Sequence, residues 1–147
     1  MSSWISHLPD EISYARVAGL GMNLEELEAN KRLDDVRVQN LNESPALPYP
    51  AGSFDRVMIV VSVQYLIRPV EVMRSVREVL DEGGQLCIAL SHRLFPTKAV
   101  LAFAALPPKE RIELVHYYLA AAGYEDVTFE DASPQAGDPL WIVTGTA

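Results

Sequence analysis

The stretch that decides the fold spans residues 47–86 and reads LPYPAGSFDRVMIVVSVQYLIRPVEVMRSVREVLDEGGQL. It opens with a proline-rich loop, because proline lacks the backbone donor that a strand or helix needs. Five consecutive apolar residues, Val57 to Val61, then indicate a strand covered on both faces, which is typical of a central strand. Apolar residues recur at helical spacing from Pro69 until the Gly83-Gly84 pair. The predicted order is a loop over residues 44–53, a central strand over 54–66, a helix from 69 to 82 and a strand over 85–90.

Further strands and helices are predicted on both sides of this stretch. On the N-terminal side, Asn23 with Glu26 three positions on resembles a capping box that starts a helix. On the C-terminal side, Gly123 stands where a left-handed helix cap is wanted. The further elements expected are strands over 15–20 and 36–41, the second nearer a sheet edge, helices over 96–106 and 109–122, and strands over 126–130 and 140–144.

The alternation of strands and helices favours the α/β class, with a largely parallel sheet between two layers of helices. The last two strands follow each other without a helix, so one of them must pair antiparallel. With 147 residues, of which 49% are hydrophobic, the chain is expected to form a single domain, residues 1–147.

Charge and composition exclude several classes of partner and site. The net charge of −8 disfavours nucleic acid and anionic membrane surfaces. The longest apolar run, residues 57–63, is far shorter than the roughly 20 residues of a membrane helix. The N-terminus lacks the pattern of a secretory signal, so we expect a cytoplasmic protein. Cys87 is the only cysteine, which excludes an internal disulfide and a cysteine cage, and we assign no metal site.

The loop, SFDRV, strand, helix, GG and strand of residues 47–86 resemble the class I S-adenosylmethionine-dependent methyltransferases, specifically the methyltransferase type 11 group. The residues that match this pattern are Phe54, Asp55, Leu80, Gly83 and Gly84. The resemblance covers nearly the whole chain from Ala15 onward. It implies a Rossmann-like sheet of three layers, S-adenosylmethionine as cofactor, and methyl transfer to a small-molecule acceptor.

The cofactor motifs of the family match less well. No Gly-x-Gly-x-Gly loop precedes Ala15, so the chain resembles a truncated member that lacks the first strand and its motif. Gly21 stands where the family has the carboxylate that holds the ribose, and Asn40 stands where it has an Asp near the adenine. Gly19 and Gly21 also form a G-x-G between a strand and a helix. That pattern suggests either a phosphate-binding turn, with NAD as a minor alternative, or simply a tight turn.

The missing strand is a central one in the family's sheet. Each buried backbone group left unpaired in such a gap costs about 1–3 kcal/mol, so the gap must be repaired. We expect either that the strand from Ala15 moves beside the strand from Phe54, or that a second copy or another polypeptide supplies the pairing. The exposed edge and the apolar aromatics together predict a homodimer.

Polar residues follow two neighbouring strands at their carboxyl ends, where open α/β sheets bind their ligands. Ser62 and Gln64 end the predicted central strand and are candidate cofactor contacts, although ordinary strand-end polarity explains them equally well. His92 follows the next strand and is the candidate general base. A loop histidine without a catalytic role is the alternative. For the whole chain, the alternative to a methyltransferase is an inactive scaffold of the same fold that serves binding or oligomerisation.

Overall fold

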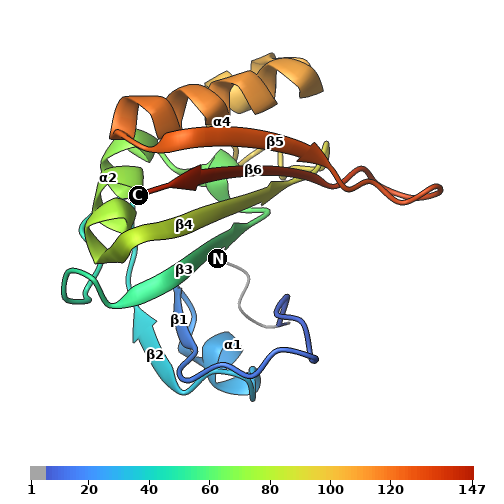
Figure 1. Cartoon of the computed structure of the whole chain (residues 1–147). Coiled ribbons are helices and arrows are strands. Elements are labelled where there is room, and N and C mark those ends of the chain that lie inside the picture. The colour runs from blue at the N-terminus through green and yellow to red at the C-terminus, as the bar shows by residue number, and fades with distance from the viewer. Residues whose placement is uncertain (1–5) are drawn as a thin grey trace. The chain divides into compact units, whose positions relative to one another are not determined.

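A computed structural model describes residues 6–147 of the chain. The chain divides into two compact units, Met1–Asn40 and Leu41–Ala147. Each unit has its own sheet, with two strands in the first unit and four in the second (Figure 1).

The first unit is a strand, a short helix and a second strand. Strands β1 (Ala18–Gly21) and β2 (Asp35–Val38) pair in parallel, and helix α1 (Leu24–Ala29) connects them. Asn23 caps the helix as predicted, because its side chain accepts a hydrogen bond of 3.0 Å from the backbone N–H of Glu25.

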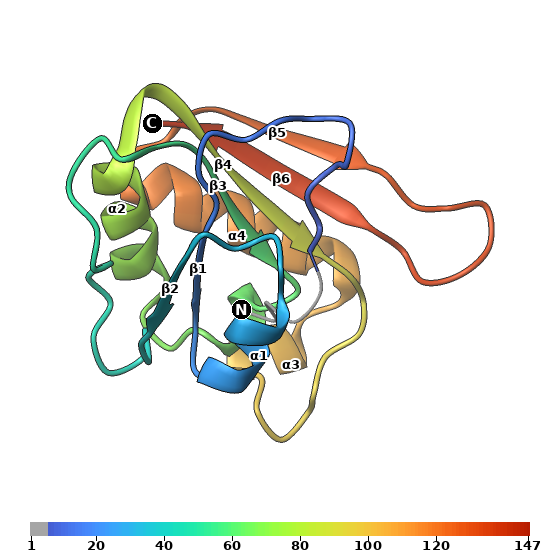
Figure 2. The ribbon, with the colours of Figure 1, turned by 90° about the horizontal axis from the view of Figure 1, so that it is seen from below.

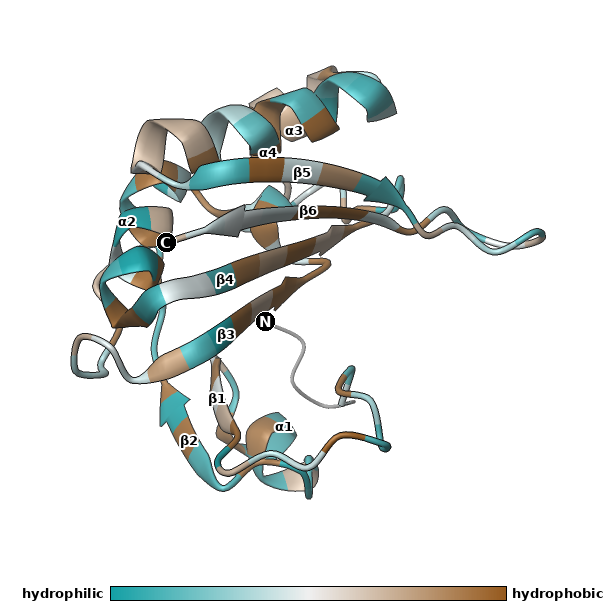
Figure 3. Ribbon diagram, in the orientation of Figure 1, coloured by the Kyte–Doolittle hydropathy of each residue, from teal (hydrophilic) through white to brown (hydrophobic). Residues whose placement is uncertain are grey.

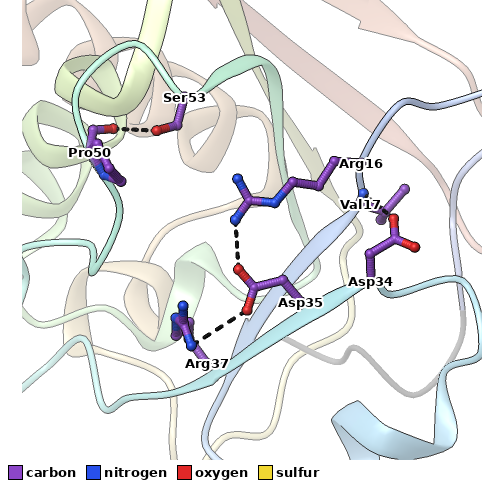
Figure 4. Close-up of polar contacts among 7 residues, drawn as sticks. All are labelled: Arg16, Val17, Asp34, Asp35, Arg37, Pro50 and Ser53. Atoms are coloured by element: carbon purple, nitrogen blue, oxygen red, sulfur yellow. Dashed lines mark hydrogen bonds and ion pairs between the residues drawn. The ribbon is translucent and has the colours of Figure 1, made fainter.

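Ionic contacts hold the amino ends of β1 and β2 together (Figure 4). The Asp35 carboxylate lies 2.6 Å from the Arg16 guanidinium and 3.6 Å from that of Arg37. Asp34 accepts a hydrogen bond of 2.8 Å from the backbone N–H of Val17. These charges fix the register of the pair at the end opposite the carboxyl edge, so we assign them a structural role.

The second unit contains a four-stranded mixed sheet in the order β3-β4-β6-β5. Strand β6 runs antiparallel to both of its neighbours, and β3 and β4 pair in parallel, which confirms the predicted α/β class with one antiparallel strand near the C-terminus. The strands are β3 (Phe54–Val60), β4 (Leu80–Leu90), β5 (Glu125–Asp131) and β6 (Trp141–Thr146).

The prediction of a central strand over residues 54–66 is wrong in two respects. In the part of the chain that the structure describes, β3 pairs with β4 alone and is therefore an edge strand. An apolar run reports burial of the two faces and says nothing about the number of neighbouring strands. The strand is also shorter than predicted, because Val61 adopts a φ of +45° and the chain turns into a short 3-10 helix, η1 (Val63–Tyr65).

The predicted repair of the sheet by the strand from Ala15 stays a prediction. Within the first unit, strand β1 pairs with β2. Pairing by a second copy stays a prediction.

Two long helices cover one face of the four-stranded sheet (Figures 1 and 2). These are α2 (Pro69–Val79) and α4 (Pro108–Ala122), and a third, short helix α3 (Leu101–Ala105) precedes α4. Gly123 takes the predicted left-handed cap with a φ of +90°. The predicted end of α2 at the glycine pair is wrong, because Leu80 already pairs with Phe54 as the first residue of β4. The predicted helix over residues 96–106 is shorter, beginning at Leu101.

The core of the second unit lies between this helix layer and the sheet. Apolar colouring runs along the second halves of β3 and β4 and the first half of β6 (Figure 3). The buried Tyr124 hydroxyl donates a hydrogen bond of 3.0 Å to the backbone carbonyl of Met73, which ties the start of β5 to α2. Fully buried side chains of this core include Val72, Met73, Val76, Leu86, Ile88, Val115, Leu119 and Val143.

Candidate functional site

The candidate site begins where β3 ends, at the carboxyl edge of the four-stranded sheet. Val61 has a φ of +45°, a region that a β-branched residue avoids. Its backbone N–H donates a hydrogen bond of 2.9 Å to the carbonyl of Ala89 on β4, which holds it in place. Backbone strain of this kind concentrates at ligand sites and turns. The strain therefore indicates the end of β3 as a candidate ligand site.

Two buried polar residues follow the strained position. Ser62 is 1% exposed and Gln64 is 4% exposed. Among the described residues, Ser75 is the other buried polar residue. The Gln64 Nε2 atom donates a hydrogen bond of 3.1 Å to the Val61 carbonyl. Its Oε1 atom is buried and has no hydrogen-bond partner within residues 6–147. A buried acceptor without a donor costs about 1–3 kcal/mol, so this oxygen is suited to a donor supplied by a ligand.

A third polar group, Ser91, lies at the end of the neighbouring strand β4. Its Oγ atom is also buried and without a partner in the described part of the chain. The loop that follows is tied back to η1, because Val100 N–H donates to the Gln64 carbonyl at 3.0 Å and Phe95 N–H donates to the Tyr65 hydroxyl at 3.0 Å. The sequence analysis missed Ser91. Its signal is the same as that of Ser62, a polar residue directly after an apolar strand.

Asn42 holds η1 from the other side and was also missed. Its Nδ2 atom donates a hydrogen bond of 2.9 Å to the Tyr65 carbonyl. Its Oδ1 atom accepts one of 2.9 Å from the Ile67 N–H. Both ends of the amide are used within the protein, so Asn42 fixes the segment that carries Gln64 and is a positioning residue.

The candidate base His92 lies in the loop after β4, and its side chain is 46% exposed. Its Nε2 atom is 3.7 Å from the Asp138 carboxylate, too long for a hydrogen bond. Asp138 instead makes an ion pair of 2.5 Å with Arg93. The His92 carbonyl accepts a hydrogen bond of 3.1 Å from the Arg111 guanidinium, which restrains the loop. The imidazole is therefore accessible to a substrate, with a carboxylate nearby that the sequence did not reveal.

The remaining predicted residues, Gly19, Gly21 and Asn40, belong to the first unit. Gly19 lies inside β1 rather than in a turn, and a Cβ there would come within 2.4 Å of Leu33 Cδ1. Close packing thus explains this glycine without a ligand. Gly21 ends β1, and its carbonyl accepts a hydrogen bond of 2.9 Å from the Gln39 N–H. Asn40 is half-buried just beyond β2. The structure brings Ser62 and Gln64 together with the loop of His92.

A groove of about 580 Å³ lies elsewhere in the second unit, between α4 and the strands β5 and β6, and contains none of the predicted site residues. Its lining residues are Lys109, Ile112, Glu113, His116, Phe129, Asp131 and Trp141. Across residues 6–147, no three His, Cys, Asp or Glu side chains are grouped as a metal site. No helix within the same residues is long and apolar enough to cross a bilayer.

Solved structures resemble the chain over about nine-tenths of its length. The cyclase SpnF has a TM-score of 0.66 and 18% identity over 89% of this chain and 66% of its own. An S-adenosylmethionine-dependent methyltransferase from Mesorhizobium loti has a TM-score of 0.64 and 14% identity over 90% of this chain and 80% of its own. A putative methyltransferase in complex with the Haloferax volcanii Trm112 methyltransferase activator has a TM-score of 0.67 and 14% identity over 90% of this chain and 71% of its own.

These likenesses show the fold, which is the Rossmann-like sheet of methyltransferases. Because the chain spans between 66% and 80% of the lengths of these structures, what the longer proteins do is not carried over from the likeness alone. No curated protein matches the chain. A family model described as a methyltransferase domain matches residues 3–88, more than half of the chain, which therefore belongs to this family.

Proposed function

We propose that the protein binds S-adenosylmethionine at the carboxyl ends of β3 and β4 and transfers its methyl group to a small-molecule acceptor. Family membership supports this proposal over the inactive scaffold. The observation that carries it is the pair of buried polar atoms, Gln64 Oε1 and Ser91 Oγ, that lack partners within residues 6–147 and follow adjacent parallel strands. Open α/β sheets bind their ligands at this edge.

The residues present fit the cofactor in part. Gln64 Oε1 can accept a hydrogen bond from an amino or hydroxyl group, and Ser91 Oγ can donate or accept one. Ser62 stands between the strained Val61 and Gln64 in the sequence and is 1% exposed. Asn40 offers a carbonyl oxygen for an amino group, but Gly21 has no side chain with which to hold a ribose. We therefore assign the strongest contacts to Gln64 and Ser91 and weaker ones to Gly19, Gly21 and Asn40.

S-adenosylmethionine supplies, when bound, a methyl group on a positively charged sulfur. The protein then has to orient the acceptor and, where the acceptor carries a proton, remove it. His92 is the group proposed for the second task, because its imidazole is half-exposed at the correct edge of the sheet. The Asp138 carboxylate lies 3.7 Å from the Nε2 atom of this imidazole.

A homodimer and a cytoplasmic location, both expected from the sequence, are part of this proposal. The relative from Haloferax volcanii is in complex with an activator protein. A partner protein of that kind is a second possibility for this chain, and light scattering of the purified protein separates a homodimer from a monomer that awaits another protein.

Calorimetric titration of the full chain with S-adenosylhomocysteine tests the cofactor site without knowledge of the acceptor. We expect micromolar binding. Folded protein that does not bind the ligand at millimolar concentration would overturn the proposal.

A Gln64→Leu variant tests the assigned contact. It removes both polar atoms at similar volume, so we expect weaker binding of S-adenosylhomocysteine. The stability should change by no more than about 1 kcal/mol, because the buried acceptor without a donor disappears together with the hydrogen bond to the Val61 carbonyl. Thr128→Val on β5 is the matched control and should bind as the wild type does. Equal affinity of Gln64→Leu and wild type would remove Gln64 from the site.

A further inference from the structure

The groove between α4 and the strands β5 and β6 is not used by the proposed function. All of its lining residues belong to the second unit, and none of them is at the proposed cofactor site. Its volume of about 580 Å³ lies within the range of about 300–1,000 Å³ that is usual for small-molecule sites. The groove is therefore large enough to hold an organic ligand.

Helix α4 runs alongside strand β5 in the opposite direction (Figure 1). The chain reverses at Gly123, between the two elements. The 15-residue helix spans about 22 Å and the seven-residue strand about 23 Å, so the two match in length. The start of α4, with Lys109, therefore lies level with the end of β5, where Asp131 is.

One side of α4 and one face of the sheet form the two walls. On the sheet, Phe129 and Asp131 are two residues apart and Asp131 pairs with Trp141, so their three side chains lie on the same face. Phe129 pairs with the fully buried Val143, so this is the face that the helices cover. The helix residues recur at spacings of three and four, which places them on one side of α4, and are Lys109, Ile112, Glu113 and His116.

The sheet wall of the groove is aromatic. Phe129 is 50% exposed although it lies on the covered face, and Trp141 is half-buried. Within residues 6–147, neither ring stacks on another aromatic ring or lies under a cation. Aromatic ring faces attract cations as well as apolar groups. Both rings are therefore available to a ligand of either kind.

The charged side chains of the groove lack ion-pair partners in the part of the chain that the structure describes. Lys109 and Glu113 form no ion pair, although their four-residue spacing would allow one. Asp131 accepts hydrogen bonds from Ser133 at Oδ1 alone, which leaves Oδ2 for another donor. Two carboxylates thus face one lysine, whose long stem allows its ammonium group to reach solvent. A positively charged occupant complements the excess of negative charge.

We propose that this groove is a second ligand site and that its ligand is an organic cation with an aromatic body, such as an arylalkylamine. The ring packs between Ile112 and the aromatic side chains Phe129 and Trp141, and the ammonium group lies against the carboxylates of Glu113 and Asp131. Carboxylates and ring faces both favour a cation, whereas they repel a carboxylate of the same shape. The site does not depend on whether S-adenosylmethionine binds.

Tryptophan fluorescence detects binding directly, because Trp141 lines the groove. In a Trp4→Phe background Trp141 is the only tryptophan of the chain. Phenethylamine should change its fluorescence with millimolar affinity, as expected for so small a ligand. Phenylpropionate, which has the same ring and a carboxylate in place of the ammonium group, is the matched control and should bind much more weakly. Equal affinities for the two, or no response to phenethylamine from folded protein, would overturn the proposal.

A charge-neutral variant tests the assigned contact. Glu113→Gln keeps the shape of the side chain and should raise the Kd of phenethylamine by about fivefold or more, because a hydrogen bond to a charged group is lost. Glu110→Gln, on the same helix but outside the groove, is the matched control and should bind as the wild type does. Circular dichroism establishes that both variants are folded. Equal affinities of these two variants would overturn the assignment.

The same signal separates a small ligand from a second copy of the chain. With a small ligand as the occupant, the fluorescence of Trp141 should not depend on protein concentration in the absence of phenethylamine. Fluorescence that changes with protein concentration, together with a dimer in light scattering, would assign the groove to a second copy and overturn the proposal.

Discussion

The two edge strands of the four-stranded sheet, β3 and β5, differ in what they contribute. Strand β3 buries Ile59 and is apolar over most of its length, whereas nearly every residue of β5 is exposed. Four of the seven residues of β5 are acidic, and β3 has one acidic residue. Position at an edge therefore does not tell which strand is adapted to it. The side chains differ instead, because charges of the kind found along β5 are typical of a strand edge that faces solvent.

Truncation of one side chain on each strand should separate their contributions most strongly. Ile59 is 8% exposed and Phe129 is 50% exposed. Ile59→Ala should lower the free energy of unfolding by about 2–5 kcal/mol, because it leaves a cavity at a buried position. Phe129→Ala should cost at most about 1 kcal/mol. Urea denaturation of both variants measures the difference, and equal losses would contradict the view that β3 belongs to the core and β5 does not.

Breaking the hydrogen bond between Tyr124, before β5, and Met73 on α2 should lower the free energy of unfolding by a smaller amount. Removal of the Tyr124 hydroxyl in Tyr124→Phe breaks its hydrogen bond to Met73, with an expected cost of about 0.5–1.5 kcal/mol. Burial raises the pKa of Tyr124 above its ordinary value of 10. The stability that the neutral Tyr124 side chain contributes is therefore fully present below pH 10 and is lost as the pH rises through its pKa in the folded protein. The free energy of unfolding of the variant should decrease less over the same pH range. Tyr117→Phe, at an exposed position, is the control and should change neither quantity.

Local signals in the sequence predicted local structure well. The Gly123 cap and the Asn23 cap depend on a few adjacent residues, and both are present. The end of α2 was misplaced, because the Leu80–Phe54 pairing that ends it involves a distant strand. The position of β3 in the sheet was mispredicted for the same reason. Its apolar run predicted burial of its faces but could not predict how many strands lie beside it.

The candidate site divides in the same way. Ser62 and Gln64 could be predicted, since a polar residue after an apolar strand is visible in the sequence. The clamp by Asn42 was missed because its partner Tyr65 is 23 residues away. The approach of Asp138 to His92 was missed because it depends on how the loop between β5 and β6 folds back to the end of β4. Contacts between loops far apart in sequence leave no periodic pattern to detect.

Both edges also contain a residue with a left-handed backbone, which allows a matched comparison. Val61 follows β3 with a φ of +45°, and Asp126 lies in β5 with a φ of +46°. A β-branched residue pays about 1–2 kcal/mol in this region, whereas Asp tolerates it. After the entropic cost of glycine in the unfolded chain, Val61→Gly should stabilise the protein by up to about 1 kcal/mol. Asp126→Gly should be close to neutral. Thermal unfolding measures both, and a loss of stability in Val61→Gly would mean that the side chain itself is needed.

The smallest expected effect concerns the Asp131 carboxylate, at the end of β5. Hydrogen bonds from the Ser133 hydroxyl and backbone N–H hold the pKa of Asp131 below its ordinary value of 3.8. A lowered pKa gives stability that is present above pH 3.8 and is lost as the pH falls through the value in the folded protein. Ser133→Ala should therefore lower the urea midpoint slightly at pH 7 and not at pH 2. An equal decrease at both pH values would mean that Ser133 acts through its hydrogen bond with Leu140 N–H instead, and that the carboxylate at this edge is charged without help from its neighbour.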